Sequence, residues 1–311
     1  MKYRKLGKTN WQVSAVSMGC WGIGGQWGEV SERDALEAIH AARDAGVNLF
    51  DTADAYGLGR SEELVGKALG NRPDDVYIAT KVGNWGRRLD DHLPYKTVHS
   101  IYESCHASLY RLKSDFIDLY QCHIGSPEHP EIFLEAFETL KTQGKIRHYA
   151  ISTDHLDALQ AMNANGACAS CQVNYSILVR SPEKALLPYC RENEIGVLVR
   201  SPLAMGILTG KFSPDTRFDD QVRRGWNEGG AREKFVKRVS LVERLKPLSN
   251  QGRSLLDIAL QFTLANPAVT CPIPGMKNTD QARSNVAAVN GELSESDLRE
   301  IDEVFPPGTD N

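Results

Sequence analysis

Three features are scarce in this sequence: long apolar runs, an excess of one charge, and a paired set of cysteines. No segment approaches the roughly 20 apolar residues of a membrane-spanning helix, and the opening residues, MKYRKLGKTN, contain no signal-like hydrophobic stretch. With 36 basic and 40 acidic residues, the net charge of −4 gives no general attraction to nucleic acid or to an anionic membrane. We therefore expect a cytoplasmic protein that acts on a small molecule, without nucleic acid or membrane as a partner.

The cysteines and histidines give little support for a disulfide framework or a metal site. Seven cysteines, an odd number spread along the chain, fit reduced thiols better than paired ones. Cys168 and Cys171 form one C-x-x-C motif, but without a second pair plain packing is favoured over a zinc or redox role. The eight histidines include no H-x-H pair, which a metal-dependent barrel hydrolase would commonly carry. We expect no metal, and loss of activity with a chelator would revive the hydrolase alternative.

Strand-like and helix-like segments alternate along almost the whole chain, after a β-hairpin expected at residues 3–14. The expected strands are 15–23, 48–54, 76–82, 116–123, 146–152, 170–175, 196–202 and 269–274. The expected helices are 31–45, 61–69, 95–112, 129–143, 155–163, 182–193, 231–248, 254–265, 279–289 and 294–304.

Eight strands, each joined to the next through a helix, predict parallel pairing with right-handed crossovers. We therefore predict an α/β fold, a (β/α)8 TIM barrel with an N-terminal β-hairpin and extra C-terminal helices, as a single domain over residues 1–311. An open doubly wound sheet would usually carry G-x-G-x-x-G after its first strand. The glycines of Gly19-Cys-Trp-Gly-Ile-Gly-Gly25 lack that spacing.

Four polar residues follow or end consecutive expected strands: Asp51, Tyr56, Lys81 and His123. The carboxyl ends of barrel strands share one face, so these side chains should converge. An ammonium inside a strand is costly unless a carboxylate pairs with it, and Asp51 is the nearest candidate for Lys81. Each residue alone could be structural, but together they allow general acid chemistry, because a neighbouring cation lowers the pKa of a phenol from about 10.

The loop after Asp51 leads into a helix. Ser61 is expected to cap that helix, with Glu62 and Glu63 in its first turn favouring the positive end of the helix dipole. Asp54, between Asp51 and Tyr56, is expected to point out of the site.

The phrase Phe50-Asp-Thr-Ala-Asp-Ala-Tyr-Gly57, with Lys81 and His123 at their spacing, resembles the catalytic tetrad of the aldo-keto reductases, in the bacterial, NADP-dependent type. Further family-like stretches cover the chain, namely Leu6-Gly-Lys-Thr9, Gly144-Lys-Ile-Arg-His-Tyr149, Gln172-Val-Asn-Tyr-Ser176, Ser201-Pro-Leu-Ala-Met-Gly-Ile-Leu-Thr-Gly-Lys211 and residues 273–285. The resemblance implies hydride transfer from NADPH to an aldehyde or ketone without a metal. Tyr56 would protonate the oxygen, Lys81 would lower the tyrosine pKa while paired with Asp51, and His123 would orient the carbonyl.

The resemblance also implies a set of cofactor-binding residues. Lys277 would meet the 2′-phosphate and so favour NADPH over NADH. The full set is Trp21, Gly22, Asp51, Ser152, Gln172, Asn174, Arg200, Ser201, Leu203, Lys211, Gly275, Lys277, Gln281 and Asn285.

Two positions depart from the family pattern. Many members have an aromatic residue where this chain has Arg200, although some carry arginine too; the guanidinium could stack on the nicotinamide or favour anionic substrates. Thr153 stands where asparagine is common.

The substrate pocket is expected to be formed by tryptophans of the strand-end loops together with two tetrad residues. The loop before Trp226 is locally basic, which fits either a cofactor clamp or a solvated loop, through Arg217, Arg223 and Arg224. A competing function is a cofactor-binding regulatory or sensor protein of the same fold with little turnover. The sequence makes no prediction of the oligomeric state. The expected pocket residues are Trp21, Tyr56, Trp85, His123 and Trp226.

Overall fold

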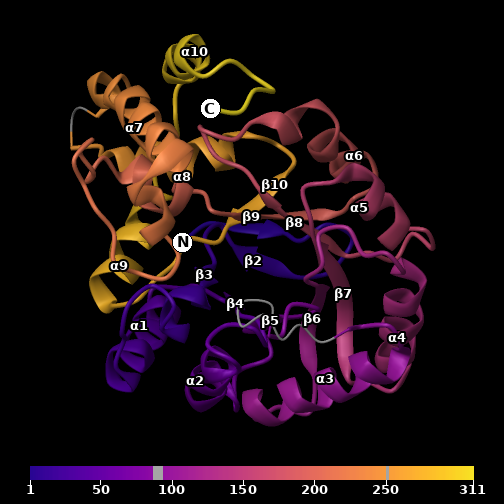
Figure 1. Cartoon of the computed structure of the whole chain (residues 1–311). Helices are drawn as coiled ribbons and strands as arrows, with labels where there is room; N and C mark the ends of the chain where they lie inside the picture. The colour runs from indigo at the N-terminus through magenta and orange to yellow at the C-terminus, as the bar shows by residue number, and fades with distance from the viewer. Residues whose placement is uncertain (87–93, 250–251) are drawn as a thin grey trace.

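The computed structural model describes residues 1–86, 94–249 and 252–311 (Figure 1). In these residues eight parallel strands form one sheet, and each strand pairs with its neighbour along the chain. The strands are β3 (Met18–Gly19), β4 (Leu49–Asp51), β5 (Tyr77–Val82), β6 (Ile117–Cys122), β7 (Ile146–Ser152), β8 (Ser170–Asn174), β9 (Gly196–Arg200) and β10 (Val269–Pro272).

The first and last strands meet and close the sheet. The Ser17 N–H donates to the Pro272 carbonyl at 3.0 Å, and the Gly19 N–H donates to the Pro274 carbonyl at 2.9 Å. Gly19 also forms a parallel bridge with Gly275. The predicted (β/α)8 barrel is therefore confirmed.

Helices surround the sheet on its outer side (Figure 1). Several begin with a side-chain cap, and the last helix begins with a capping box in which Ser294 and Asp297 are bonded reciprocally. The helices are α1 (Glu32–Asp44), α2 (Arg60–Leu69), α3 (Val98–Leu112), α4 (Pro130–Thr142), α5 (Leu156–Met162), α6 (Leu186–Glu192), α7 (Gly229–Glu243), α8 (Leu255–Ala265), α9 (Thr279–Ala288) and α10 (Glu295–Val304). No helix in the described part of the chain is both long and apolar enough to cross a membrane.

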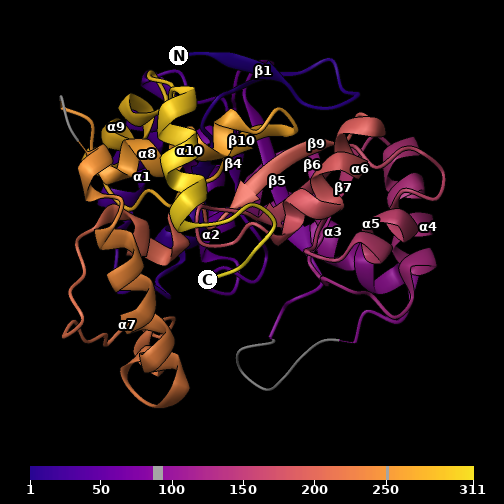
Figure 2. The ribbon, with the colours of Figure 1, turned by 90° about the horizontal axis from the view of Figure 1, so that it is seen from above.

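The predicted hairpin is present as β1 (Tyr3–Lys5) and β2 (Gln12–Ser14), and it covers the amino-terminal end of the barrel. Leu6 and Trp11 belong to the same buried apolar cluster as inward-facing residues of the strands, such as Leu119 and Leu198. The Trp11 ring stacks on Tyr77 at 4.5 Å between centroids. Figure 2 shows the hairpin at one end of the molecule and α7 at the other. Because the hairpin closes the amino-terminal end, the carboxyl ends of the strands form the open face of the barrel.

Several predicted element bounds differ from the structure, and two of these differences lie beside the open face of the barrel. The first strand is only Met18–Gly19 and continues as a 3-10 turn at Cys20–Gly24, because the chain bends across the barrel mouth. Ser61 is not a helix cap, since α2 begins at Arg60 after Gly59, whose φ of 90° is left-handed. The Ser61 hydroxyl instead donates to the Cys20 carbonyl at 2.8 Å and accepts from the Thr52 hydroxyl at 2.8 Å.

Candidate active site

Lys81 joins Asp51 to Tyr56 at the carboxyl ends of β4 and β5. Its ammonium donates to Asp51 Oδ1 at 2.6 Å, to the Thr52 carbonyl at 2.7 Å and to the Tyr56 hydroxyl at 3.3 Å. All three donors of the lysine are therefore used, and its side chain is fully buried. Because the Tyr56 oxygen accepts from Lys81, its own hydrogen can be donated to another acceptor.

The other oxygen of Asp51 is held by two buried amides. Gln121 Nε2 donates to Asp51 Oδ2 at 2.9 Å, and Gln172 Nε2 donates to the same atom at 2.8 Å. Gln172 Nε2 also lies 3.2 Å from Gln121 Oε1. The carboxylate thus has a partner for each oxygen, as a buried charge requires.

Burial and charge act in opposite directions on this group. Burial alone would lower the pKa of Lys81, but Asp51 and Tyr56 outweigh it and the net pKa is raised, so the lysine stays charged. Burial raises the pKa of Tyr56, and the charges of Lys81 and Arg200 oppose that effect. The predicted lowering by Lys81 is therefore present, but in this structure the effect of burial exceeds it.

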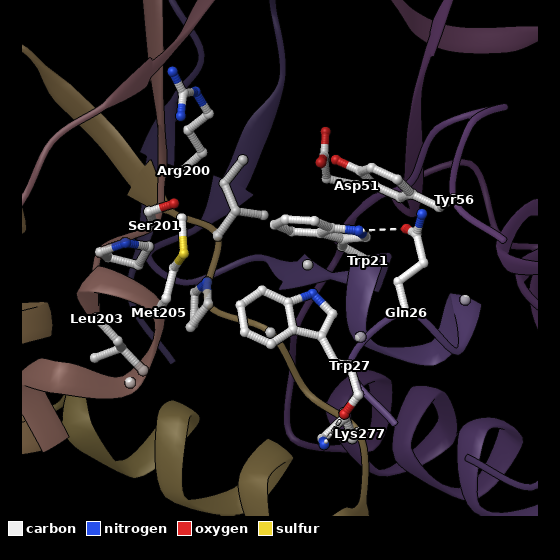
Figure 3. Close-up of a pocket in the computed structure, with 18 of the residues that line it drawn as sticks. Trp21, Gln26, Trp27, Asp51, Tyr56, Arg200, Ser201, Leu203, Met205 and Lys277 are labelled. Carbon is white, nitrogen blue, oxygen red and sulfur yellow. Dashed lines mark hydrogen bonds between the residues drawn. The ribbon is translucent and has the colours of Figure 1, made fainter. Parts of the chain in front are cut away.

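Aromatic side chains surround the Tyr56 ring. The imidazole of His123 lies edge-on to it at 5.9 Å, and the indole of Trp21 is stacked on it at 5.9 Å. Trp21 Nε1 donates to Gln26 Oε1 at 2.6 Å, and Trp27 meets the Trp21 ring edge-on at 4.9 Å (Figure 3). The Tyr56 ring therefore lies between the rings of Trp21 and His123.

These residues open into a cavity of about 1260 Å³ at the open face of the barrel. That is larger than the roughly 300–1,000 Å³ of a typical small-molecule site. Most of the residues expected at the cofactor and substrate line it. They are Trp21, Gly22, Asp51, Tyr56, His123, Ser152, Gln172, Arg200, Ser201, Leu203, Lys211, Gly275, Lys277, Gln281 and Asn285.

Three expected residues do not line this cavity among the described residues. The Arg111 guanidinium lies over the Trp85 ring, with its central carbon 5.3 Å from the centroid of that ring. Trp226 packs edge-on against Phe218 at 5.6 Å between ring centroids. Asn174 is half-buried at the end of β8, where its backbone N–H donates to Asp154 Oδ1 at 2.8 Å. The pocket roles of Trp85 and Trp226 and the cofactor role of Asn174 stay predictions.

Three cationic side chains lie near one another at the end of the cavity away from the tetrad. They belong to Lys211, Arg223 and Lys277. Burial lowers the pKa of Lys211, and the nearby charges of Arg223 and Lys277 lower it further. Lys277 Nζ donates to the Trp27 carbonyl at 3.2 Å, and the Arg223 guanidinium lies 5.2 Å from the centre of the Trp27 ring. Such mutually repelling cations at one end of a cavity suit a phosphate-bearing ligand.

The segment after β10 lines the same end of the cavity, and its side chains form hydrogen bonds with its own backbone. Gln281 Oε1 accepts from the Lys277 N–H at 2.8 Å, and Asn285 Nδ2 donates to the Gly275 carbonyl at 3.3 Å. The nearby N-terminus of α9 adds a positive helix-dipole end.

Arg200 and Thr153, the two positions that depart from the family pattern, both form polar contacts in the structure. Arg200 lines the cavity and forms an ion pair with Asp154, which offsets its charge. The Thr153 hydroxyl donates to the Gly125 carbonyl at 2.5 Å and accepts from the His155 N–H at 3.0 Å. Thr153 is buried and fastens two strand-end loops together.

Sequence reasoning missed Gln26, Trp27 and Gln121 and treated Arg223 as one of several loop arginines. Gln121 lies inside a strand expected to be buried, where only its polarity could have drawn attention to it. Arg223 has a local signal, because Asp220 three residues earlier pairs with it at 2.8 Å. Each cysteine is a buried free thiol. Within the described ranges no group of three or more His, Cys, Asp or Glu side chains could hold a metal ion.

The fold and the site together indicate the class of protein. Linked Asp, Lys and Tyr side chains lie at the open face of a closed barrel, beside a cavity that is cationic at one end. Residues 15–305 match the model of the Aldo/keto reductase family. The chain belongs to the aldo/keto reductase family and is a carbonyl oxidoreductase.

Relatives and solved structures cover almost the whole chain. The NADH-specific methylglyoxal reductase of Escherichia coli is 35% identical, over 98% of this chain and 99% of its own length. The holo form of aldo-keto reductase AKR11C1 from Bacillus halodurans has a TM-score of 0.83 and 31% identity, covering 100% of this chain and 98% of that one. An aldo-keto reductase from Klebsiella pneumoniae in complex with NADPH has a TM-score of 0.77 and 25% identity, covering 98% and 95% of the two chains.

Proposed function

We propose that the protein reduces a small aldehyde or ketone to its alcohol with NADPH, and that Tyr56 is the general acid. One observation carries the proposal: the Lys81 ammonium bonds both Asp51 and the Tyr56 hydroxyl at the wall of the cavity. A buried cation paired on one side with a carboxylate can stabilise the tyrosinate that forms when Tyr56 loses its proton.

Each residue of the tetrad has a separate part in this reaction. Bound NADPH supplies hydride to the carbonyl carbon. Tyr56 gives its proton to the carbonyl oxygen, so that hydride and proton together complete the alcohol. His123, whose ring faces the Tyr56 ring, orients that oxygen, and Trp21 keeps water from the same place.

The other end of the cavity fits the phosphates of NADPH. Lys211, Arg223 and Lys277 would hold phosphate groups, with Gln281 and Asn285 at the adenosine. The Klebsiella pneumoniae structure contains NADPH, whereas the Escherichia coli relative is named as NADH-specific. The Lys277 ammonium at this end supports NADPH here.

The test is a panel of aromatic, short-chain and sugar-derived aldehydes with methylglyoxal, followed through the oxidation of NADPH. We expect Tyr56→Phe to lower the rate by at least about a hundredfold, because general acid catalysis commonly contributes that much. Tyr110→Phe, which removes a hydroxyl from a tyrosine that is 86% exposed, is the matched control. Equal rates for wild type and Tyr56→Phe would refute the acid role. Cofactor binding without turnover of any carbonyl would favour the regulatory alternative.

A further inference from the structure

Gln121 is a fully buried glutamine on β6 that touches the tetrad from behind. It pairs with Lys81 across the β5–β6 register, so both side chains belong to one level of the barrel. Its relative exposure is 0%, and it does not line the cavity among the described residues. Substrate and cofactor in the cavity are thus out of its reach, and its contact with the site is the Asp51 carboxylate.

The contacts of Gln121 fix the orientation of its amide. Nε2 donates to Asp51 Oδ2 at 2.9 Å, and Oε1 lies 3.2 Å from Gln172 Nε2. A reversed amide would place an oxygen against the carboxylate and an NH2 group against another NH2 group. The chemistry therefore allows one orientation, with the donor towards Asp51.

We propose that Gln121 is a positioning residue of the reaction, which fixes the orientation of the Asp51 carboxylate and thereby keeps Lys81 in place to stabilise Tyr56 as the proton leaves. The inference rests on the proposed function of Tyr56. It extends that function to a residue outside the tetrad that acts through Asp51 and Lys81.

Three hydrogen-bond donors hold the Asp51 carboxylate. Among the described residues, Oδ1 accepts from Lys81, and Oδ2 accepts from the two amides of Gln121 and Gln172. Without Gln121, Oδ2 loses one of its two donors, and the buried Asp51 carboxylate is held less firmly. The Lys81 ammonium, which bonds the same carboxylate, is then less firmly positioned beside the Tyr56 oxygen and stabilises the tyrosinate less.

Gln172 cannot be used to isolate this effect. It makes a similar bond to Asp51 but also lines the cavity, so its replacement would change ligand binding as well. Gln121 separates the two effects, because in the described part of the chain its side chain bonds only to Asp51 and Gln172, while ligands stay on the other side of the carboxylate. A change at Gln121 should alter kcat and its pH dependence, with little effect on KM.

The experiment compares Gln121→Leu and Gln121→Glu with Gln261→Leu. Gln261 is another buried glutamine, bonded to the Ala288 carbonyl at 2.8 Å and outside the site, so it controls for burying leucine in place of an amide. For Gln121→Leu we expect kcat to fall about tenfold and KM to stay within about twofold. The basic limb of the pH profile should move up by about one pH unit, since a tenfold change corresponds to one unit.

Gln121→Glu keeps the shape of the side chain and tests the donor directly. A carboxyl group beside a carboxylate retains its proton to unusually high pH and can then donate as the amide does. We expect this variant to match wild type in acid and to lose activity as the introduced group ionises. This nearly isosteric variant also carries the test if Gln121→Leu fails to fold.

A second measurement does not depend on turnover. In protein labelled with ¹³C-tyrosine, with NADP+ bound, the Tyr56 resonance is assigned by its loss in Tyr56→Phe and titrated with pH. We expect a higher pKa for Tyr56 in Gln121→Leu and an unchanged one in Gln261→Leu. Identical Tyr56 titrations in wild type and both Gln121 variants would overturn the inference. Failure of wild type to reduce any carbonyl would instead overturn the proposed function, with the titration still deciding the role of Gln121.

Discussion

Asp54 lies between two tetrad residues and yet belongs to a different environment. As predicted it does not line the cavity among the described residues, and it is buried, with 2% exposure. Burial raises its pKa to about 8, and the neighbouring Glu62 adds to the effect. The Ala55 N–H, at 2.6 Å from Asp54 Oδ1, and the charge of Arg111 oppose it. Arg111 is already committed to Glu62 at 2.6 Å, so two buried carboxyl groups share one nearby guanidinium.

Asp54→Asn should therefore stabilise the protein in a pH-dependent way. The carboxyl has an ordinary pKa near 4, so between about pH 4 and pH 8 the folded state binds the proton more tightly than the unfolded state. Its contribution to stability consequently falls as the pH rises through this window. Asparagine retains the oxygen that accepts from Ala55 and does not titrate.

The measurement is the melting temperature at about pH 5 and about pH 8. The gain of Asp54→Asn over wild type should be larger at the higher pH by at least about 2 °C, which corresponds to roughly 1 kcal/mol in a chain of this size. Asp115→Asn, at an exposed position, controls for the lost charge. A gain that is the same at both pH values would contradict the prediction.

The start of α2 shows why element boundaries near the site were harder to predict than the elements. Ser61 followed by acidic residues is a good capping pattern, but the helix begins at Arg60 after the left-handed Gly59. A Cβ on Gly59 would lie 2.6 Å from Arg111 Cδ, so the tertiary fold determines which residue precedes the helix. Neither the φ value nor the contact with α3 is visible in the local sequence.

Replacement of Gly59 by alanine should cost more than the same change at Gly144. Both residues have positive φ, but a Cβ on Gly144 meets nothing within 4 Å. We expect Gly144→Ala to cost about 1 kcal/mol from backbone strain alone. Gly59→Ala should cost about 1–3 kcal/mol more, because it displaces Arg111 from Glu62. Denaturant unfolding gives both values, and equal costs would show that Arg111 yields without loss.

At the scale of the whole chain, the barrel could be predicted because each strand and each helix has a recognisable pattern in its own local sequence. The convergence of Asp51, Tyr56, Lys81 and His123 could be predicted because strand ends converge in any barrel, while their catalytic roles stay predictions. The positions of Trp85 and Trp226 could not, since the direction of a loop side chain depends on the neighbours it packs against, here Arg111 and Phe218. Gln121 was missed for a similar reason, because it contacts Asp51 of β4 and Gln172 of β8, which are distant from it in sequence. The prediction of a single domain over residues 1–311 stays a prediction.

The cationic end of the cavity is assembled from two distant parts of the chain, the segment between β9 and α7 with Lys211 and Arg223 and the segment after β10 with Lys277. Cofactor preference is therefore a property of the assembled barrel. Lys277→Glu should raise the dissociation constant of NADPH about 10–100-fold, because a charge-assisted contact is lost and a repulsion introduced. NADH, without the 2′-phosphate, should change by less than about threefold. Cofactor titration by calorimetry measures both constants. Arg283→Glu makes the same charge change on an exposed residue of α9, and a similar loss there would point to a general field instead of a specific contact.

Two of the five tryptophans, Trp21 and Trp27, stand edge-on to each other at the cavity wall, and the Trp27 carbonyl holds the Lys277 ammonium (Figure 3). A reduced nicotinamide absorbs light at the wavelengths where indoles emit. The arrival of such a cofactor would quench the emission of this pair by energy transfer, and its departure would restore it. The molecule therefore has an intrinsic optical signal for the occupancy of its own cavity, without any attached dye.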